Sequence, residues 1–433
     1  MCRIASDTQF IEETLADIIR VDEFTRNLLD INRYVQKEGL AQPVQSCINR
    51  SDYMMDRFHT DGIGLCNRIR QVEINAIASG MSSQGFKTHQ MHEYLLNKYQ
   101  IKLNRCSIPD NDSVRTVAQG LIDGFDAYGR TGCYILLVAE ERSLNFADHL
   151  SIELIVHETR PDIKFVRVRF IDLPPITKLG PNKELLLDRG AGTQEIALVY
   201  FRFCYDPSNY SFNGAWRTRL LLERSLAIKC PSINFHLAGA KKFQQVLNDP
   251  MRLERFLDSK DASRLSQVFC KFWSLEPNSR QGKEGYNIGL NDSRNLVLKP
   301  QREGGGHNIF GEDIKVFLDN IADSDLRSQY ILMEYINSPK ERNWLMLYDD
   351  TVESESTRRL DSDQLISELG IYGSVLAERG VVRSNRVGGY LVRSKKFGVK
   401  EGGVASGFAG ISSLLLVDDD ANLDSDLFFV VED

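Results

Sequence analysis

Apolar residues in the first part of the chain recur with the period of a helix. Two runs have spacings of three or four residues: Ile11, Leu15, Ile18, and then Phe24, Leu28, Ile31, Val35. Such spacing places apolar side chains along one side of a helix. The pattern therefore predicts two amphipathic helices over residues 10–35, broken near Asp22.

Further along, the period changes to that of strands. At residues 71–75, alternation puts Glu73 and Asn75 on one side of a strand and Val72 and Ile74 on the other. We also predict strands at residues 134–139, 164–170 and 195–201, a helix at 146–158 and a hairpin around 189–192. This order is typical of an inserted βαβ-type domain, so the expected fold class is α/β (α+β).

Downstream of this insertion, short strands are expected to alternate with glycine-rich loops. The strands are predicted at residues 295–299, 330–336, 365–370 and 390–395, and the acidic stretch 349–356 predicts an exposed loop. These changes divide the chain into a helical and strand part (1–133), the insertion (134–236), a third unit (237–417) and an acidic tail (418–433).

Composition excludes several classes of protein. The chain has 433 residues, of which 42% are hydrophobic, and a net charge of -7 without a long basic block. This argues against disorder and against nucleic acid or an anionic membrane surface as the main partner. The eight cysteines form no CxxC pair and no apolar run reaches a membrane span, so we expect free thiols, no zinc knuckle and a cytoplasmic protein.

The most informative segment for chemistry follows an apolar strand at residues 296–298. It reads Lys299-Pro300-Gln301-Arg302-Glu303-Gly304-Gly305-Gly306-His307-Asn308. Consecutive glycines let backbone N–H groups approach an anion, while Lys299 and Arg302 add positive charge and Glu303 offers a hard oxygen ligand. The segment is neither a Walker A loop nor a GxGxxG fingerprint, and the alternative is a flexible surface loop.

Other polar pairs are weaker signals. Glu73 and Asn75 could both ligate Mg²⁺ from one side of their strand, but such a pair is more often solvated. Arg393 and Lys395 have the same spacing and would usually be surface charges. His89 and His92 lie at helical spacing without a third ligand nearby in the sequence, so a zinc site is not expected there.

Seven segments in order along the chain closely resemble the eukaryotic glutathione synthetase family. They are residues 49–54, Glu73-Ile74-Asn75, residues 221–225, 237–242, 299–306, 366–370 and Gly402-Gly403-Val404-Ala405. The resemblance implies an ATP-grasp fold in which residues 134–236 bind substrate and residues 237–417 bind nucleotide and form lids. It also implies a ligase, usually a homodimer, that joins γ-glutamyl-cysteine to glycine with ATP and Mg²⁺ through an acyl phosphate.

The resemblance also implies roles for individual residues. Its metal ligands correspond to Glu73, Asn75 and Glu303. Its ATP contacts correspond to Lys241, Lys299, Gly304, Gly305, Gly306, Met333, Ile336, Glu368, Lys395 and Glu401. Its substrate contacts correspond to Arg50 near the reacting carboxyl, to Asn145, Arg202 and Tyr205 for the dipeptide, and to Arg393, Val404 and Ala405 for glycine. The residues expected to act in catalysis are Arg50, Lys299 and Arg393.

Departures from the family concentrate on the dipeptide side. Ala78 and Gly80 replace serines, Ser143 and His149 replace an acidic residue and a glutamine, and Phe203 and Cys204 replace Asp and Gly. If each lost polar contact is worth roughly 1–3 kcal/mol, γ-glutamyl-cysteine should bind more weakly. On the nucleotide side His307, Phe310 and Glu401 are smaller changes.

Three interpretations therefore remain open. The chain is a working glutathione synthetase, a diverged ligase with another acid or amine substrate, or a nucleotide-binding protein without turnover. The retained metal and phosphate residues favour the first two. The family has additional helices before the match at Phe10, so we expect a missing segment, and a secretion signal there would replace the cytoplasmic assignment.

Overall fold

The computed structural model describes residues 1–60, 62, 64–140, 143–190, 192–348, 358–400, 402–404, 407–418 and 429–431. For residues 342, 346–348, 358–363 and 429–431 only the backbone is described. The predicted acidic loop at residues 349–356 and most of the predicted acidic tail therefore lie outside the described residues.

The N-terminal helices confirm the predicted break near Asp22. They are α1 (Cys2–Ala5), α2 (Thr8–Leu15), α3 (Ile18–Val21) and α4 (Glu23–Glu38). The Asp22 carboxylate accepts a hydrogen bond from the backbone N–H of Thr25 at 3.0 Å, which starts α4 as an N-cap does. The apolar face of α4, with Phe24, Leu28 and Val35, is buried in the main core.

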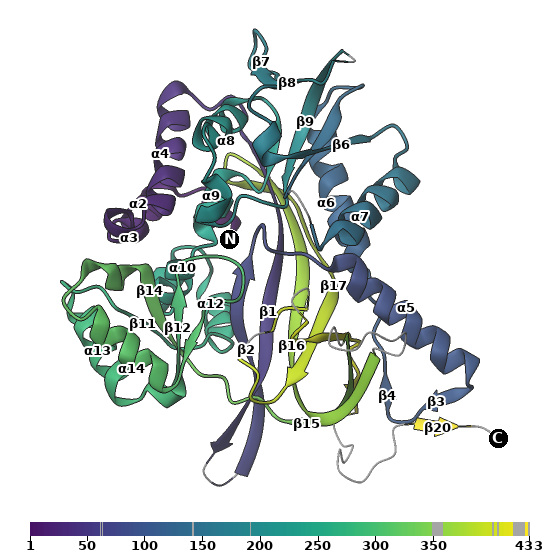
Figure 1. Cartoon of the computed structure of the whole chain (residues 1–433), viewed down its shortest axis with the longest axis vertical. Coiled ribbons are helices and arrows are strands. Elements are labelled where there is room, and N and C mark those ends of the chain that lie inside the picture. The colour runs from purple at the N-terminus through teal and green to yellow at the C-terminus, as the bar shows by residue number, and fades with distance from the viewer. Residues whose placement is uncertain are drawn as a thin grey trace.

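A central antiparallel sheet connects the two ends of the chain. Its order is β18–β17–β16–β1–β2, with β15 also paired to β16. The strands are β1 (Val44–Thr60), β2 (Gly64–Asn75), β15 (Glu341–Tyr348), β16 (Arg358–Glu378), β17 (Val381–Lys396) and β18 (Gly410–Ser412). Strands far apart in sequence thus lie side by side along the middle of the molecule (Figure 1).

The prediction of short strands at residues 365–370 and 390–395 was wrong about their length. These segments belong to β16 and β17, which have 21 and 16 residues. The first half of β17 is largely exposed and shows no apolar alternation. Its backbone pairing with β16, and not the burial of one face, keeps it in the sheet. Such pairing leaves no mark in a local hydrophobic pattern.

The predicted βαβ insertion is confirmed by a second sheet. Its order is β6–β5–β9–β8–β7, with β10 paired to β9. The strands are β5 (Tyr134–Ala139), β6 (Lys164–Arg169), β7 (Thr177–Leu179), β8 (Leu185–Asp188), β9 (Thr193–Phe201) and β10 (Ile228–Cys230). Strand β5 lies between the parallel strands β6 and β9, which explains its continuous apolar run, and β8 and β9 form the predicted hairpin.

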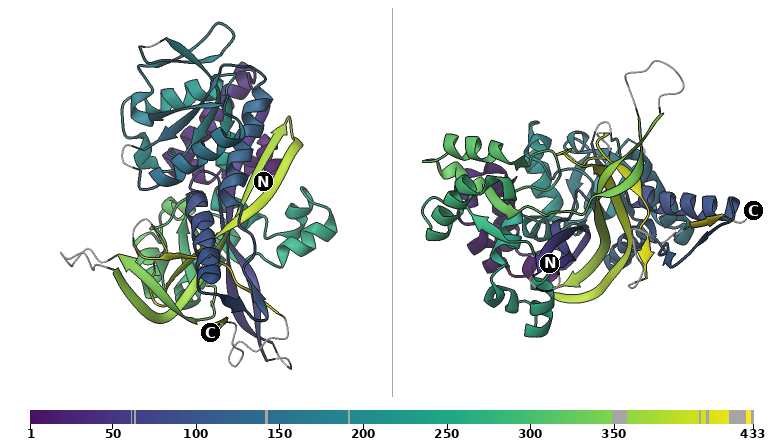
Figure 2. Two further views of the ribbon diagram at one scale, coloured as in Figure 1. Left: turned by 90° about the vertical axis from the view of Figure 1, so that its right-hand side faces the viewer. Right: turned by 90° about the horizontal axis from the view of Figure 1, so that it is seen from below.

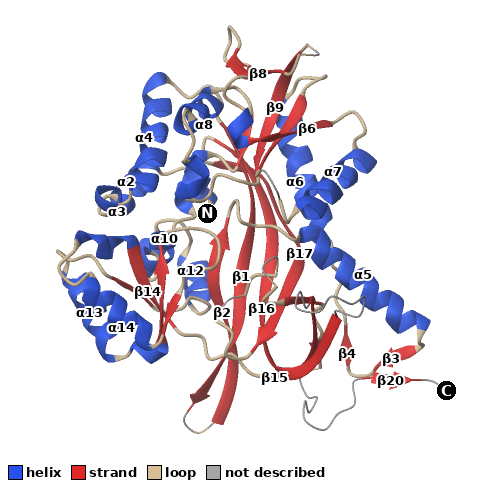
Figure 3. Cartoon of the chain, viewed as in Figure 1, coloured by secondary structure: helices blue, strands red, loops and turns tan. Residues whose placement is uncertain are grey.

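Helices flank both sides of the long strands, as Figure 3 shows. On one side are α5 (Ser82–Lys98), α6 (Ser113–Tyr128) and α7 (Phe146–Thr159), and α7 confirms the predicted helix at 146–158. Helix α6 packs between the two sheets, because Val117 and Leu121 share a core with Leu137 of β5 and Tyr372 of β16. None of the described helices has the length and apolar character that a membrane crossing requires.

A third sheet, β11–β14–β12–β13, lies to the lower left in Figure 1, and Figure 2 gives two further views. Its strands are β11 (Phe272–Ser274), β12 (Leu296–Pro300), β13 (Ile309–Phe310) and β14 (Tyr330–Glu334). The other α-helices are α8 (Ala215–Arg224) and α9 (Ile233–Ala238), which pack against α4, and α10 (Lys241–Val246), α11 (Pro250–Glu254), α12 (Ser259–Ser266), α13 (Arg280–Asn291) and α14 (Glu312–Asn320). The remaining strands form two small pairs: β3 (Ile101–Leu103) with β20 (Phe429–Val431), and β4 (Cys106–Ser107) with β19 (Leu416–Val417).

Candidate functional site

Four neighbouring strands of the central sheet bring charged side chains together. In the register of β1 and β2, Arg50 lies opposite Asn75 and Asp52 opposite Glu73. On the other side of β1, Glu368 of β16 lies opposite Arg393 of β17. Because alternate residues of a strand share a face, these residues form one polar surface. The prediction that Glu73 and Asn75 share a side is confirmed, since Asn75 Nδ2 donates to Glu73 Oε1 at 3.0 Å.

Asp52 is the centre of this polar surface. Its carboxylate accepts from Arg50 Nε at 2.6 Å, from Arg50 Nη2 at 2.8 Å and from Asn75 Nδ2 at 3.0 Å. Arg393 Nη2 lies 3.5 Å from the same carboxylate and donates to Glu368 Oε1. A Cβ at Gly370 would lie 2.5 Å from Arg50 Cδ, so only glycine leaves room for this pair. Two arginines and two carboxylates thus balance one another in a network that is buried at Arg50 and Asp52 and half-buried at Glu368 and Arg393.

Two lysines meet Glu73 at the edge of this network. Lys241, the first residue of α10, places Nζ 3.1 Å from Glu73 Oε2 and also donates to the carbonyl of Arg302. Burial opposes ionisation of Glu73, but Lys241 and Lys299 outweigh it and hold the pKa of Glu73 well below its usual range. Burial lowers the pKa of Lys299 on β12, and Glu73 opposes that shift. Both lysines are buried.

Glu303 joins the site from the glycine-rich segment. Its Oε2 accepts from the backbone N–H groups of Ile77 at 2.8 Å and Ala78 at 3.1 Å. Ile77 and Ala78 lie two and three positions after Asn75, so Glu303 lies beside the end of β2 although more than 220 positions separate them in the sequence. Burial raises the pKa of the Glu303 carboxyl, while these backbone donors and Lys241 oppose that rise.

The predicted metal ligands include two oxygens that have no hydrogen-bond partner among the described residues. They are Asn75 Oδ1 and Glu303 Oε1, and both are buried. Among the described residues, the one group of three His, Cys, Asp or Glu side chains with ligand atoms within 4.8 Å is His89, Glu93 and Asp110. Glu73 and Glu303 do not belong to that group, so the carboxylates of the predicted metal site do not enclose an ion by themselves. Hard oxygens of this kind beside two buried lysines nevertheless fit Mg²⁺, which takes few protein ligands and completes its shell with phosphates and water.

A second polar cluster surrounds Arg202 at the end of β9. The guanidinium donates to the Ile77 carbonyl at 3.0 Å and to His149 Nε2 at 3.3 Å, and its Nη2 lies 3.8 Å from Asp148. A Cβ at Gly80 would lie 2.7 Å from Arg202 Nη2 and 3.5 Å from Asn145 Oδ1. The structure therefore brings Arg202 and Asn145 together, and the absent side chain at Gly80 provides room for the guanidinium.

The predicted adenine-binding residues lie in an apolar cluster. Met333 on β14 and Ile336 are buried with Cys270, and Val72 of β2 packs against them. This cluster connects the third sheet to the strand that carries Glu73. An apolar wall next to cationic side chains is an arrangement that suits a nucleotide, whose base is apolar and whose phosphates are anionic.

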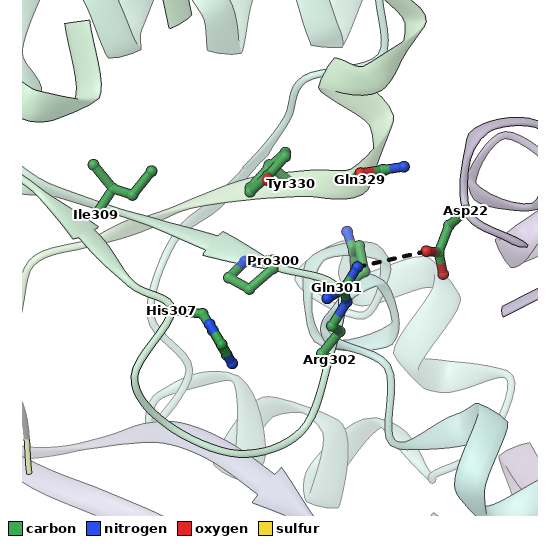
Figure 4. Close-up of a pocket in the computed structure, with 8 residues that line it drawn as sticks. All are labelled: Asp22, Pro300, Gln301, Arg302, His307, Ile309, Gln329 and Tyr330. Atoms are coloured by element: carbon green, nitrogen blue, oxygen red, sulfur yellow. Dashed lines mark ion pairs between the residues drawn. The ribbon is translucent and has the colours of Figure 1, made fainter. Parts of the chain in front are cut away.

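The glycine-rich segment borders a cavity of about 160 Å³ (Figure 4). Its lining residues are Asp22, Pro300, Gln301, Arg302, His307, Ile309, Gln329 and Tyr330. Arg302 Nη2 lies 3.8 Å from Asp22 Oδ1, which ties the start of the segment to the N-cap of α4. On the other side, the ring of Tyr205 would lie 3.3 Å from a Cβ at Gly304, whereas Gly305 and Gly306 are exposed.

The remaining predicted residues lie near the end of β17. Lys395 Nζ donates to the carbonyl of Lys400 at 2.9 Å, a contact that involves neither Glu73 nor the two lysines beside it. Val404 is half-buried, and its carbonyl accepts from the N–H of Gly407 at 3.0 Å. Glu401 and Ala405 lie outside the described residues.

Three residues that hold the site together were not among the residues predicted from the sequence. Asp52 could have been found from its i, i+2 spacing to Arg50 on a strand. Tyr372 donates its hydroxyl to the Gly80 carbonyl at 2.7 Å, and Asp148 accepts from the N–H groups of Met81 and Ser83 at 3.0 and 2.8 Å. Their partners lie 292, 67 and 65 positions away, and no local signal marks such contacts.

Comparison with known proteins places these observations in one family. The model of the eukaryotic glutathione synthase ATP-binding domain matches residues 1–416. Glutathione synthetase of Xenopus laevis is 34% identical over 417 residues, which is 96% of this chain and 84% of that protein. The human glutathione synthetase is 36% identical over 410 residues, covering 94% of this chain and 82% of that protein.

A solved structure shows the same fold. It is the apo form of a glutathione synthetase-like effector from Globodera pallida, with a TM-score of 0.69 and 21% identity over 95% of this chain and 82% of that chain. At this identity the likeness concerns the fold and not the chemistry.

Proposed function

This chain belongs to the eukaryotic glutathione synthetase family of ATP-dependent, peptide-bond-forming ligases, and we propose that it joins γ-glutamyl-cysteine to glycine using ATP and Mg²⁺. In the proposed reaction the terminal carboxylate of the dipeptide attacks the γ-phosphorus of ATP, the bond from that phosphorus to the ADP oxygen breaks, and ADP leaves. The amine of glycine then attacks the carbonyl carbon of the acyl phosphate, and the amide forms as phosphate leaves and the nitrogen loses a proton.

The observation that carries this proposal is the pair of unpartnered oxygens beside two buried lysines. Asn75 Oδ1 and Glu303 Oε1 accept no hydrogen bond from any residue that the structure describes, and Lys241 and Lys299 act together on Glu73. A site for a neutral substrate would have little use for two buried ammonium groups at this position. Mg²⁺, when bound, neutralises charge on the phosphate oxygens during phosphoryl transfer.

The chain's own residues have distinct proposed tasks. Lys241 and Lys299 stabilise the phosphates, and their burial strengthens that interaction because the local dielectric is low. Arg393 holds the glycine carboxylate, and Arg50 holds the reacting carboxyl of the acid. Asp52 orients both guanidiniums and is a positioning residue. Lids at residues 304–306 and 402–403 would exclude water from the acyl phosphate.

The proposal is tested by ADP and phosphate release from ATP in the presence of γ-glutamyl-cysteine and glycine, each omitted in turn. Release that requires the acid supports the ligase. Release that is the same with and without any acid contradicts it.

A diverged ligase with another acid is the second candidate. The observation that favours it is the cluster around Arg202, which contacts His149 and fills the space beside Gly80, at two positions where the resemblance implies a glutamine and a serine. A nucleotide-binding protein without turnover is less favoured, because such a protein has no physical need for the buried lysines and the unpartnered oxygens together.

We also propose a homodimer that works in the cytoplasm. The family resemblance supports the dimer, and eight free cysteines suit a reducing compartment. Light scattering on the purified protein should give about twice the chain mass of 49.2 kDa. A monomer at micromolar concentration would contradict the dimer and leave the ligase unaffected.

A further inference from the structure

Three side chains that the proposed ATP site does not use meet beside the middle of α5. His89 and Glu93 lie one turn apart on this helix, and Asp110 belongs to the loop that precedes α6. One ligand atom from each of the three lies within 4.8 Å of those of the other two. A zinc site was not expected here, because the sequence showed His89 and His92 without a third ligand nearby. The fold supplies Asp110.

The imidazole of His89 is buried without being held by an ordinary hydrogen bond to Glu93. The residue is 4% exposed, and its Nδ1 has no partner among the described residues. Its Nε2 lies 3.4 Å from Glu93 Oε2, which is longer than the roughly 2.7–3.2 Å of an N–H···O hydrogen bond. A direct ion pair would require a protonated ring, and its Nδ1–H would then be buried without an acceptor.

The distance between these two atoms is that of two ligands on one metal ion. Zn²⁺ binds a histidine nitrogen at about 2.0–2.1 Å and a carboxylate oxygen at about 2.0–2.2 Å. Two such ligands at the tetrahedral angle are about 3.3–3.5 Å apart. The observed 3.4 Å therefore allows an ion to bind both groups without a movement of α5.

The loop that carries Asp110 is fixed to strand β17. The Tyr390 hydroxyl donates to the carbonyl of Pro109 at 3.0 Å. Asn111 Nδ2 donates to the carbonyl of Tyr390 at 2.9 Å, and the N–H of Tyr390 donates to Asn111 Oδ1 at 2.8 Å. Helix α5 also packs on β17 (Figure 1), so the helix and the loop are held against the same strand. Ligands held in this way lose little conformational freedom when an ion binds.

The ligand types select the class of ion. Mg²⁺ and Ca²⁺ prefer oxygen ligands, whereas an imidazole nitrogen suits Zn²⁺ and related transition metals. Two carboxylates balance the charge of a divalent ion. Glu93 and Asp110 are both exposed, so water can complete the coordination.

We propose that His89, Glu93 and Asp110 form a binding site for a divalent transition-metal ion such as Zn²⁺, which joins α5 to the start of α6. This site lies outside the machinery of the proposed ligase reaction and does not depend on it.

The test is isothermal titration calorimetry of the full, untagged chain with Zn²⁺, without and with an excess of Mg²⁺. Accessible thiols are alkylated beforehand, because thiolates also bind Zn²⁺, and five of the eight cysteines are buried. The wild type should bind one Zn²⁺ at this site in both conditions. Zn²⁺ should also raise its melting temperature, because an ion that binds the folded state stabilises it.

Two variants remove one ligand each. Loss of a residue that only supports a metal ligand weakens metal binding about 10- to 100-fold, so Glu93→Gln and Asp110→Asn should each raise the Kd for Zn²⁺ about 100-fold or more. Both should also lose the Zn²⁺-dependent rise in melting temperature. Because both side chains are exposed, the metal-free variants should fold like the wild type.

The matched controls are Asp112→Asn and Glu158→Gln. Asp112 is exposed two positions from Asp110 and makes no side-chain hydrogen bond to the start of α6, and Glu158 is exposed on α7. Both controls should bind Zn²⁺ like the wild type.

Three results would overturn the proposal. They are no Zn²⁺ binding by the wild type, equal binding by the ligand variants and their controls, and loss of Zn²⁺ binding when Mg²⁺ is present. The ligase proposal would stand after each of them.

Discussion

Replacing Asp52 by Asn should destabilise the protein strongly, although the change is nearly isosteric. Asp52 is fully buried and forms two hydrogen bonds to Arg50, at 2.6 and 2.8 Å. Asparagine removes the negative charge and leaves the Arg50 guanidinium, 4% exposed, without a counter-charge. Breaking a buried pair by removing one partner costs about 3–5 kcal/mol. Arg393 is less affected, since Glu368 remains its partner.

This cost translates into a modest shift in melting temperature. At about 2.1 cal/mol/K per residue, unfolding 433 residues as one unit has an entropy near 0.9 kcal/mol/K. A loss of about 3–5 kcal/mol therefore corresponds to roughly 3–6 °C. Differential scanning calorimetry measures this directly.

Asp30→Asn is the matched control for Asp52→Asn. Asp30 pairs with Arg33 at 3.2 Å, but both side chains are about half exposed, and such pairs contribute about 0–1 kcal/mol. The control should shift the melting temperature by less than about 1 °C. If Asp52→Asn behaves like Asp30→Asn, the charge network around Asp52 does not hold the sheet together and our account of its electrostatics is incorrect.

Three further variants test separate parts of the site. Arg393→Lys should raise KM for glycine about tenfold or more while KM for ATP changes little, because lysine cannot grip a carboxylate through two parallel hydrogen bonds. Glu303→Gln should raise the Mg²⁺ concentration needed for half-maximal activity, since a neutral amide binds a hard cation more weakly than a carboxylate. Gly80→Ala should raise KM for the acid about tenfold, because the new Cβ would lie 2.7 Å from Arg202 Nη2 and displace it.

Each of these variants can fail in a recognisable way. Equal rises in KM for glycine and ATP would show that Arg393 does not face the amino-acid acceptor. An unchanged Mg²⁺ requirement in Glu303→Gln, with the exposed Glu254→Gln as its control, would remove Glu303 from the metal site. A normal KM for the acid in Gly80→Ala would show that Arg202 can move at no cost.

The hydrophobic pattern of the sequence was sufficient to predict helices and strands whose buried residues recur at regular intervals or form a continuous run. Strand β5 is buried throughout and α4 is buried on one face, so both leave clear signals at residues 134–139 and 24–35. The full lengths of β16 and β17 could not be predicted, because their outer parts are exposed and are held by pairing to distant strands. The periodicity of apolar side chains indicates which residues are buried, but it does not indicate which strands form backbone hydrogen bonds.

Site residues could be predicted from the sequence where they lie close together in one motif. Contacts that depend on the pairing of strands distant in the sequence could not be predicted. The i, i+2 pair Glu73 and Asn75 was found from alternation alone. The contact of Asp52 with Arg393 joins residues 341 positions apart and needs the order of three strands. The family resemblance also implied that Gly80 stands where the family has a serine, but only the structure shows that Arg202 fills the space.

The most direct test of the central claim follows the oxygen atoms of the acid. The purified protein is incubated with ATP, Mg²⁺, glycine and an acid substrate whose terminal carboxylate is labelled with ¹⁸O. The mass of the released phosphate is then measured by mass spectrometry. If an acyl phosphate forms, carboxylate oxygen stays on phosphorus when the amine attacks the carbonyl carbon. Our account predicts one ¹⁸O atom in each acid-dependent phosphate. Phosphate released without label, at a rate independent of the acid, would contradict it.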